Sequence, residues 1–433
     1  RGEELANSVT KFFLENDNLR TEISGQQLAD LEKEGIAGED FSGELGRVKK
    51  EVVRVYPFGF EFAHVLGYVS RVQPEDRQKD KDLSDLDSVG RLGIEQTYDQ
   101  VLRGKNGARI VEVDASGKVI SILGEKQTVA GGDVKLTLDA KLQRKVFEAL
   151  ESGIKKVKAN AGAVVASDVA SGQILAMVSY PSFDPDNVGQ AVVDEQEPLF
   201  NRVISGMYPP GSVFKLVSAI AGLTSGKIDK ETAIEDVGEF SIGDVKFSNW
   251  YFLNYGGRDG QVKIDRAIAR SNDIFFFRLG EMVGLKILRE AAIRLGFGQK
   301  TGIDLPGESF GLVPDEVWKQ STLGDNWFLG DTMHMAIGQG FVLSTPLQIN
   351  NLTNIIANGG KLYKPYLVSA LSKNNSEEIL IFGSSAKTVV DEGILSVVRD
   401  GMRKACESGG TAWPFFDSTY KVGCKTGTAE KLQ

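Results

Sequence analysis

The chain contains little cysteine and little histidine. Its 433 residues include two cysteines, Cys406 and Cys424, and two histidines, His64 and His334. Two cysteines are too few for a disulfide framework and lack the paired spacing of a zinc motif, so we expect both to be structural. Two histidines leave too few imidazoles for a histidine-rich metal site and do not by themselves indicate a Ser-His-Asp triad. Catalysis, if present, must therefore use Ser, Lys, Asp or Glu.

Long apolar runs and an excess of positive charge are also missing. No stretch approaches the ~20 consecutive apolar residues that a membrane-spanning helix needs. The chain starts at Arg1, so a protein whose anchor segment is absent from this chain is as compatible with this pattern as a cytoplasmic one. With 59 acidic and 50 basic residues, the net charge is −9, and no long Lys/Arg cluster could follow a phosphate backbone. We expect no nucleic-acid partner.

The composition, 41% hydrophobic and 25% charged, is that of a globular protein, and the length predicts two domains. Residues 1–132 read as an irregular, mostly β module with short β-like runs such as 63–69 and 109–113. Residues 107–125 alternate apolar and polar side chains around a Ser-Gly turn, which predicts a β-hairpin. A Gly-Gly pair at the end of this module marks a hinge.

Residues 133–433 form the second predicted domain. A strand and then a helix are predicted over 134–157, with a cap at 138–139. Residues 163–180 predict two apolar strands joined by a tight turn, and long helical patterns follow. The simplest fold class is α+β, an antiparallel sheet flanked by helices.

The segment 208–223 predicts a nucleophile and its base. The helix-breaking segment Pro-Pro-Gly stands immediately before Ser212, and an apolar helical pattern follows. Ser212 is therefore expected at a helix N-terminus. Lys215, three residues later, lies one turn along the same face, where its amine can reach the Ser212 hydroxyl. A serine hydroxyl needs a neighbour that accepts its proton, and a lysine does so only after desolvation or nearby positive charge lowers its pKa. The Ser212 backbone N–H could also donate to an oxyanion.

The Ser-x-x-Lys pattern alone has little value, because it recurs at residues 8, 152, 384 and 418. Only at Ser212 is the pattern preceded by helix-breaking residues and followed by an apolar helix.

A second motif, Ser271-Asn272-Asp273, follows the helical run 262–270 and precedes an apolar stretch. On a short loop between helices, Ser271 and Asp273 can point into one cleft. Ser271 could relay a proton between Lys215 and the leaving amine, and Asp273 could hold Lys215 or orient the substrate amide. The alternative is a plain helix cap, because Ser, Asn and Asp are favoured capping residues.

A third motif, Lys425-Thr426-Gly427-Thr428, lies on a strand-like run. Gly427 would let a substrate backbone pair with this strand. Lys425 and the hydroxyls of Thr426 and Thr428 can bind a terminal carboxylate, and the Thr428 N–H can complete an oxyanion hole. A second Lys-Thr-Gly at 300–302 is followed by Pro-Gly, which predicts a turn without a catalytic role.

The order of the motifs, with Ser-x-Asp about 60 residues after Ser-x-x-Lys and Lys-Thr-Gly on a late strand, indicates acyl transfer. With these motifs the chain resembles the class B penicillin-binding proteins. NRVISGMYPPGSVFK, GQILAMVSYPSFDP, MAIGQGFVLSTPLQ and VGCKTGTAE are similar to landmarks of that family. YPFGFEFAHVLGYV and SVGRLGIEQTYDQVLRGKNGARIVEVDASG are similar to its non-catalytic, dimerisation-type pedestal, which argues against a stand-alone β-lactamase.

The resemblance implies a peptidoglycan D,D-transpeptidase that forms an acyl-enzyme on Ser212 and that β-lactams acylate at the same residue. It implies a membrane glycan polymerase of the shape, elongation and division family as partner. It also implies a location at the extracytoplasmic face of the cytoplasmic membrane, with the anchor helix absent from this chain. The residues it assigns to catalysis and substrate binding are Ser212, Lys215, Ser271, Asp273 and Lys425, and Thr426, Gly427 and Thr428.

Two departures from the family pattern matter. Asp273 stands where Asn is commoner, and this form is similar to the elongation-type (penicillin-binding protein 2-like) members, which favours wall elongation over the alternative, septation. Some of these members carry a zinc site between the first two motifs, but residues 216–270 contain no His and no Cys, so we expect neither a metal nor another cofactor. The family continues past the third motif with a strand and a helix, so we expect the domain at 133–433 to be incomplete at its C-terminus.

Two further functions stay open. A serine β-lactamase or β-lactam sensor is one, although no Glu can be assigned to activate water at the acyl-enzyme. An inactive scaffold that only binds partners is the other, and a fluorescent penicillin would then fail to label the protein.

Overall fold

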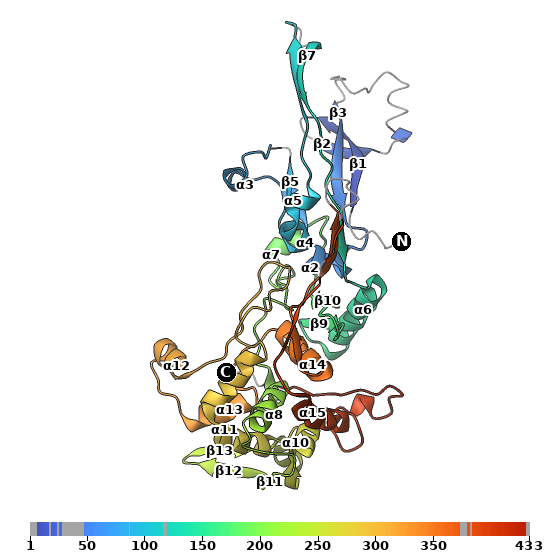
Figure 1. The fold of residues 1–433 in the computed structure, drawn as a ribbon. Helices are drawn as coiled ribbons and strands as arrows, with labels where there is room; N and C mark the ends of the chain where they lie inside the picture. Colours follow the sequence, from blue (N-terminus) through green and yellow to red (C-terminus); the bar gives the residue numbers. More distant parts are fainter. Residues whose placement is uncertain are drawn as a thin grey trace. The chain divides into compact units, whose positions relative to one another are not determined.

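The structure is a computed structural model that describes residues 7–16, 19–23, 26–27, 47–85, 87–115, 119–372, 379–381 and 383–429. Two compact units can be followed in the ribbon (Figure 1). One consists of Arg1–Asp99 and Ser182–Leu199, and the other of Gln100–Pro181 and Phe200–Gln433. The domain boundary predicted between residues 132 and 133 stays a prediction.

The first unit combines an antiparallel sheet, in the order β2-β1-β3, with a β4–β5 pair and short helices. The run 63–69, predicted as β-like, is mostly helical, which corrects that prediction. All four residues of α2 are buried, and a fully enclosed helical turn accommodates such a run better than a strand with one exposed face. The elements are β1 (Asn7–Asn16), β2 (Leu19–Ile23), β3 (Arg47–Val55), η1 (Gly59–Glu61), α2 (Ala63–Leu66), β4 (Val69–Arg71), α3 (Pro74–Lys79), β5 (Ser88–Gly90), α4 (Gly93–Thr97) and α7 (Gly189–Val193).

The second unit begins with the hairpin predicted at 107–125. It forms as the antiparallel strands β6 (Ala108–Val113) and β7 (Val119–Lys126), and residues 116–118, which include the predicted Ser-Gly turn, lie outside the described part. The strand and helix predicted over 134–157 are β8 (Val134–Leu136) and α6 (Ala140–Val157). The Asp139 carboxylate accepts a hydrogen bond from the Leu142 N–H at 3.0 Å, so the predicted cap is confirmed.

The two strands predicted over 163–180 form an antiparallel sheet of β9 (Gly162–Ser167) and β10 (Ile174–Tyr180). Helix α6 packs on both strands, and α14 (Pro346–Ala357) packs on β9. The predicted α+β class, with helices flanking an antiparallel sheet, is confirmed.

A helical core surrounds α8 (Lys215–Thr224), which packs on α10 (Ile264–Arg270), α11 (Asp273–Arg294), α13 (Leu329–Ala336) and α15 (Glu392–Ala405). Because α8 is apolar on nearly all sides, it can be enclosed in this way. None of the helices in the described part of the chain is both long and apolar enough to cross a membrane.

The remaining elements of the second unit connect or extend this core. They are α5 (Asp99–Leu102, at the junction of the units), η2 (Gly211–Phe214), β11 (Ala233–Asp236), β12 (Glu239–Ile242), β13 (Val245–Ser248), α9 (Trp250–Tyr255), β14 (Gly260–Lys263), α12 (Glu316–Leu323), β15 (Lys361–Tyr363), β16 (Val368–Ser372), β17 (Ile379–Ile381), β18 (Ala386–Thr388) and η3 (Trp413–Phe415).

Two predicted elements differ from the structure. The helix expected over 262–270 begins at Ile264, because the two residues before it belong to β14, which pairs with β11. The strand expected around the third motif does not form. A strand requires a ladder partner, and within the described residues the segment 421–429 has none. This segment is attached to α15 instead, through a 2.9 Å hydrogen bond from the Cys424 N–H to the Met402 carbonyl.

The two cysteines form a disulfide, Cys406–Cys424, with their Cα atoms 5.7 Å apart. Their predicted structural role is confirmed. Cys406 lies at the C-cap of α15, and Cys424 immediately precedes Lys425. The disulfide therefore fastens the third motif to the helical core.

Candidate active site

Ser212 lies in the first turn of η2, directly before α8, as the helix-breaking Pro-Pro-Gly segment predicts. Its side chain is partly exposed. Gly211 has a φ of 56°, and a Cβ atom at this position would lie 2.6 Å from the Thr428 carbonyl oxygen. Only glycine fits both conditions. The turn that carries Ser212 and the third motif are therefore in direct contact.

Lys215 is fully buried and bonds to the second motif. Its Nζ atom donates to Asp273 Oδ1 at 2.6 Å, to the Ser271 carbonyl at 2.8 Å and to Ser271 Oγ at 3.3 Å. The predicted hydrogen bond between the Lys215 amine and the Ser212 hydroxyl is not formed in the described structure. A buried ammonium is stabilised most by a carboxylate, and Asp273 supplies one.

The second motif divides its roles among its three residues. Asn272 caps α11, because its Oδ1 accepts a hydrogen bond from the Phe275 N–H at 2.9 Å. Ser271 has a φ of 53°, in the left-handed region that non-glycine residues seldom occupy. The capping alternative thus holds for Asn272 alone, and the side chains of Ser271 and Asp273 face Lys215.

Lys425 reaches the same hydroxyl from the third motif. Its Nζ donates to Ser271 Oγ at 2.8 Å and to the Thr426 carbonyl at 2.8 Å. Two lysine amines from segments 210 positions apart in sequence thus converge on one serine hydroxyl. The structure brings together residues of all three predicted motifs.

Burial changes the protonation of both lysines. It lowers the pKa of Lys215 below its usual value, and the Asp273 carboxylate opposes that shift. Desolvation lowers the pKa of Lys425 well below its usual value, the positive charge of Lys215 lowers it further, and Asp273 again opposes the shift. Because the Asp273 carboxylate bonds Lys215 directly, Lys425 loses its proton more readily than Lys215 does. The site thus contains an amine that is neutral at a lower pH than an ordinary lysine.

The other residues of the third motif lie against two neighbouring segments. Thr426 Oγ1 donates to Thr411 Oγ1 at 2.9 Å, and the Thr428 carbonyl accepts from Gln339 Nε2 at 3.3 Å. A Cβ atom at Gly427 would lie 2.9 Å from Val213 Cγ2 in the turn that carries Ser212, so glycine permits this close approach. Thr411 and Gln339 were not singled out as site residues, although Gln339 lies in the family landmark MAIGQGFVLSTPLQ.

A buried polar network behind the second motif was also missed. Asp236 is 2% exposed, and its carboxylate accepts hydrogen bonds from Asn249 Nδ2 and Asn272 Nδ2, each at 2.8 Å. It also accepts from two backbone N–H groups, those of Gly238 at 2.8 Å and Asp259 at 2.9 Å. The side-chain oxygen Oδ1 of Asn249 in turn accepts a hydrogen bond from the Asp273 N–H at 3.3 Å. The sequence offered one local signal, an Asp two residues before a glycine, which is typical of a turn.

The second carboxylate oxygen of Asp273 is also held by a hydrogen bond. Its Oδ2 accepts the Trp250 N–H at 3.1 Å, while its Oδ1 holds Lys215. Within the part of the chain that the structure describes, no group of three or more His, Cys, Asp or Glu residues could hold a metal ion. The bonds with Lys215, Trp250 and Asn249 hold Asp273, and with it the second motif, in place.

The fold and the site define a protein of two units, of which the second carries the three motifs in one place. The profile of the penicillin binding protein transpeptidase domain matches residues 162–433, and that of the penicillin-binding protein dimerisation domain matches residues 10–136. The chain therefore belongs to the penicillin-binding protein transpeptidase family, and the resemblance seen in its motifs is confirmed.

Known relatives resemble the chain over most of its length. Peptidoglycan D,D-transpeptidase MrdA of Acinetobacter baumannii is 34% identical over 406 residues, 89% of this chain and 57% of that protein. The chain thus spans little more than half of this relative. A penicillin-binding protein (PBP2) from Helicobacter pylori, solved in complex with MreC, is 28% identical with a TM-score of 0.79, covering 99% of this chain and 85% of that chain. A chain of a peptidoglycan synthase complex is 27% identical with a TM-score of 0.82, and the match covers 100% of this chain and 79% of that chain.

Proposed function

We propose that the chain is the catalytic part of an elongation-type peptidoglycan D,D-transpeptidase with Ser212 as its nucleophile. The observation that supports this most is the convergence of Lys215 and Lys425 on Ser271 Oγ beside the Ser212 turn. The relative MrdA carries the same activity in its name.

In the first step, Ser212 Oγ attacks the penultimate D-Ala carbonyl of a donor pentapeptide. The hydroxyl proton passes to a neutral lysine amine, Lys215 in the assignment that the motif implies, while the C–N bond breaks and D-Ala leaves after taking up a proton. Since Lys215 bonds Ser271 and Asp273 in the free protein, this transfer requires its amine to turn toward Ser212 when substrate binds. Ser271, shared by both lysines, relays the proton to the leaving amine.

In the second step, an amine of a neighbouring stem attacks the acyl-enzyme ester and restores Ser212. The same lysines accept the proton of the incoming amine and return one to Ser212 Oγ, so no proton is gained or lost overall. The N–H groups of Ser212 and Thr428 stabilise the oxyanion in both steps. Lys425, with the hydroxyls of Thr426 and Thr428, binds the terminal carboxylate of the donor.

The setting of the reaction is part of the proposal. A cross-linking enzyme of this kind works at the extracytoplasmic face of the cytoplasmic membrane, next to a membrane glycan polymerase that supplies new strands. Similarity to a PBP2 bound to MreC and to a chain of a peptidoglycan synthase complex supports this setting.

The test is turnover of a donor pentapeptide in the presence and absence of an acceptor amine. We expect D-Ala release and an amide-linked product, both abolished by Ser212→Ala. Ser152→Ala changes another Ser-x-x-Lys serine, on the exposed face of α6, and should leave both unchanged. Release of D-Ala without any linked product would refute the transpeptidase assignment.

The β-lactamase alternative is distinguished by the fate of the penicilloyl adduct. A transpeptidase should keep the adduct for hours, whereas a β-lactamase should hydrolyse it within seconds. The inactive-scaffold alternative requires no adduct at all.

A further inference from the structure

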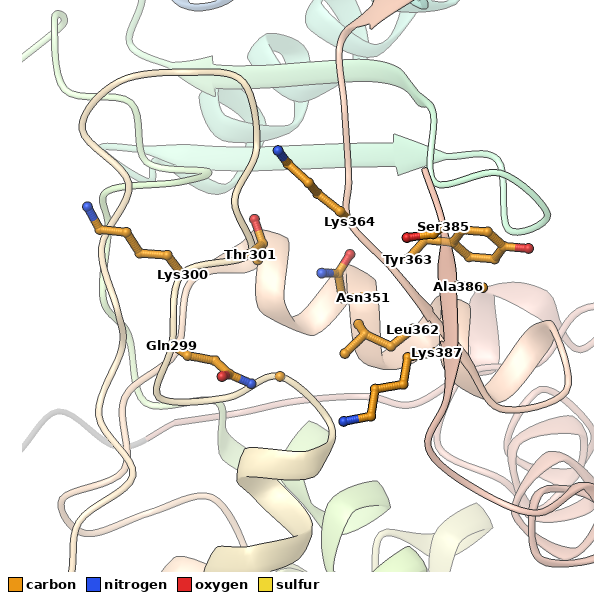
Figure 2. A pocket seen from close by; sticks show the side chains of 11 residues that line it. Gln299, Lys300, Thr301, Asn351, Leu362, Tyr363, Lys364, Ser385, Ala386 and Lys387 are labelled. Carbon is orange, nitrogen blue, oxygen red and sulfur yellow. The ribbon is translucent and has the colours of Figure 1, made fainter. Parts of the chain in front are cut away.

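A pocket of about 270 Å³ lies in the second unit between the end of α11, the 299–301 loop, α14 and the β15–β18 pair. It contains none of the motif residues. Figure 2 shows side chains of the 299–301 loop, of α14 and of the β15 and β18 segments around it. Its lining consists of Gly296, Gln299, Lys300, Thr301, Asn351, Leu362, Tyr363, Lys364, Ser385, Ala386 and Lys387.

The charge of the lining is of one sign. Lys300, Lys364 and Lys387 come from three separate segments, no acidic residue is among the lining residues, and among the described residues none of the three amines forms an ion pair. The whole chain, in contrast, has a net charge of −9. A concave site lined by one sign of charge concentrates ligands of the opposite sign.

Asn351 gives the pocket a second polar feature. The residue is 6% exposed, its side chain lines the pocket, and its amide has no hydrogen-bond partner among the described residues. Two other asparagines of α14 differ, because the amides of Asn350 and Asn354 both bond Ser167. The amide opens onto the pocket, where a water molecule or a ligand can complete its hydrogen bonds. Figure 2 shows Asn351 between Thr301 and Leu362.

The 299–301 loop is held firmly in place. The Glu308 carboxylate accepts from the Thr301 N–H at 2.6 Å and from the Gly302 N–H at 3.0 Å. Gln348 Nε2 on α14 donates to the Gln299 carbonyl at 2.9 Å. The lysine-bearing loop is therefore attached to the same helix that carries Asn351, so both sides of the pocket are preorganised.

We propose that this pocket binds a small multivalent oxyanion, a phosphate ester or a polycarboxylate, which the Asn351 amide contacts and the positive charge of the three lysines attracts. The lining supplies cations, amides and hydroxyls but no carboxylate, which matches an anionic ligand. Leu362 and Tyr363 offer a less polar wall for the uncharged part of the ligand. This site is separate from the acylation chemistry and does not depend on it.

The test is calorimetric titration of the full chain with glucose 6-phosphate, citrate and, as the uncharged control, glucose. We expect saturable binding of at least one anion with a dissociation constant of about 1 mM or tighter, and none of glucose. The preferred anion identifies the source, a phosphate ester or a carboxylate-bearing stem.

Two variants locate the binding. Changing Lys300, Lys364 and Lys387 together to Gln should weaken it at least tenfold. A matched triple variant changes Lys141, Lys227 and Lys230 to Gln, and it alters net charge equally without touching the pocket. Asn351→Leu should weaken binding severalfold without lowering thermal stability.

Penicillin acylation of every variant is measured in parallel, so that loss of the fold, or failure of the proposed enzyme function, is separated from loss of this site. Absence of binding at 10 mM of either anion, or equal weakening by both triple variants, would overturn the proposal.

Discussion

The Lys425 amine donates a hydrogen bond to the Ser271 hydroxyl at 2.8 Å, although the two residues are 154 positions apart in sequence. This contact joins the second and third motifs, and it places a second amine beside the buried Lys215. The chemistry proposed for Ser212 depends on how readily the two lysines lose their protons, which the Asp273 carboxylate opposes in both.

Acylation should show the lowered pKa values of the lysines directly. The reactive amine must be unprotonated, so the acylation rate rises with pH through its pKa, and burial moves that rise below the 10.5 of an ordinary lysine. Asp273→Asn removes the carboxylate that raises the Lys215 pKa, so the rise should shift to still lower pH, with a lower plateau. The measurement is the second-order rate constant of penicillin acylation against pH. A midpoint that stays in place or moves upward in the variant would contradict this assignment.

Lys425→Met should reduce acylation by about 10²- to 10⁴-fold, because it removes the amine that bonds Ser271. Lys421→Met is the matched control, since this exposed lysine belongs to a Ser-x-x-Lys pattern without a catalytic role. Stopped-flow or gel-based labelling with a fluorescent penicillin gives both rates. Comparable losses in the two variants would mean that general charge, and not the Ser271 contact, is responsible.

Gly211→Ala should block the approach of the third motif. The new Cβ would meet the Thr428 carbonyl oxygen at 2.6 Å, at a φ of 56° that costs roughly 1–2 kcal/mol for a non-glycine residue. Gly226→Ala imposes a similar strain, at a φ of 67°, but has no atom within 4 Å. Both variants should lose stability in denaturant unfolding, whereas only Gly211→Ala should lose acylation. If Gly226→Ala lost acylation as well, strain alone would explain the effect.

Asp236 should act as a positioning residue for the second motif. Asp236→Ala leaves several buried donors without an acceptor, so the free energy of unfolding should fall by about 3 kcal/mol or more. Acylation should also fall at temperatures where the variant remains folded, because Asn249 and Asn272 lose the partner that orients them. Asp229→Ala, at an exposed turn, serves as the control. Full acylation by the folded Asp236 variant would exclude the positioning role.

The disulfide should stabilise the fold and hold Lys425 in place. Cys406 and Cys424 are 18 residues apart, and a loop of this size corresponds to about 3 kcal/mol. The double change to Ser should therefore lower the melting temperature and slow acylation, and dithiothreitol should have both effects on the natural chain but neither on the variant. Unchanged acylation in the folded variant would show that Lys425 is positioned without the bond.

The sequence predicted those features that have local physical causes. The helix-breaking residues before Ser212 and the apolar pattern after it correctly predicted that a helix starts at this serine, and Pro-Gly after the second Lys-Thr-Gly argued against a strand there. The partner of Lys215 was only partly predicted, because the spacing of a helix turn says what an amine can reach and not which neighbour it prefers. Lys215 bonds Asp273 and not Ser212, because a carboxylate stabilises a buried ammonium more than a hydroxyl does.

Long-range contacts explain what was missed. Asp236 acquires its role from Asn249 and Asn272, which lie 13 and 36 positions away, and no periodicity links them. The strand at the third motif was expected from its residues alone, but a strand also needs a neighbour to pair with, and the described chain supplies none beside it. Likewise, the buried run at 63–69 can be read as either strand or helix until its surroundings are known.

Intact-protein mass spectrometry after penicillin treatment, with peptide mapping of the adduct, tests the central claim most directly. The account predicts one penicilloyl group per chain, located on Ser212 and absent from Ser212→Ala. An adduct on any other residue, or an unmodified chain under conditions where the protein is folded, would contradict it.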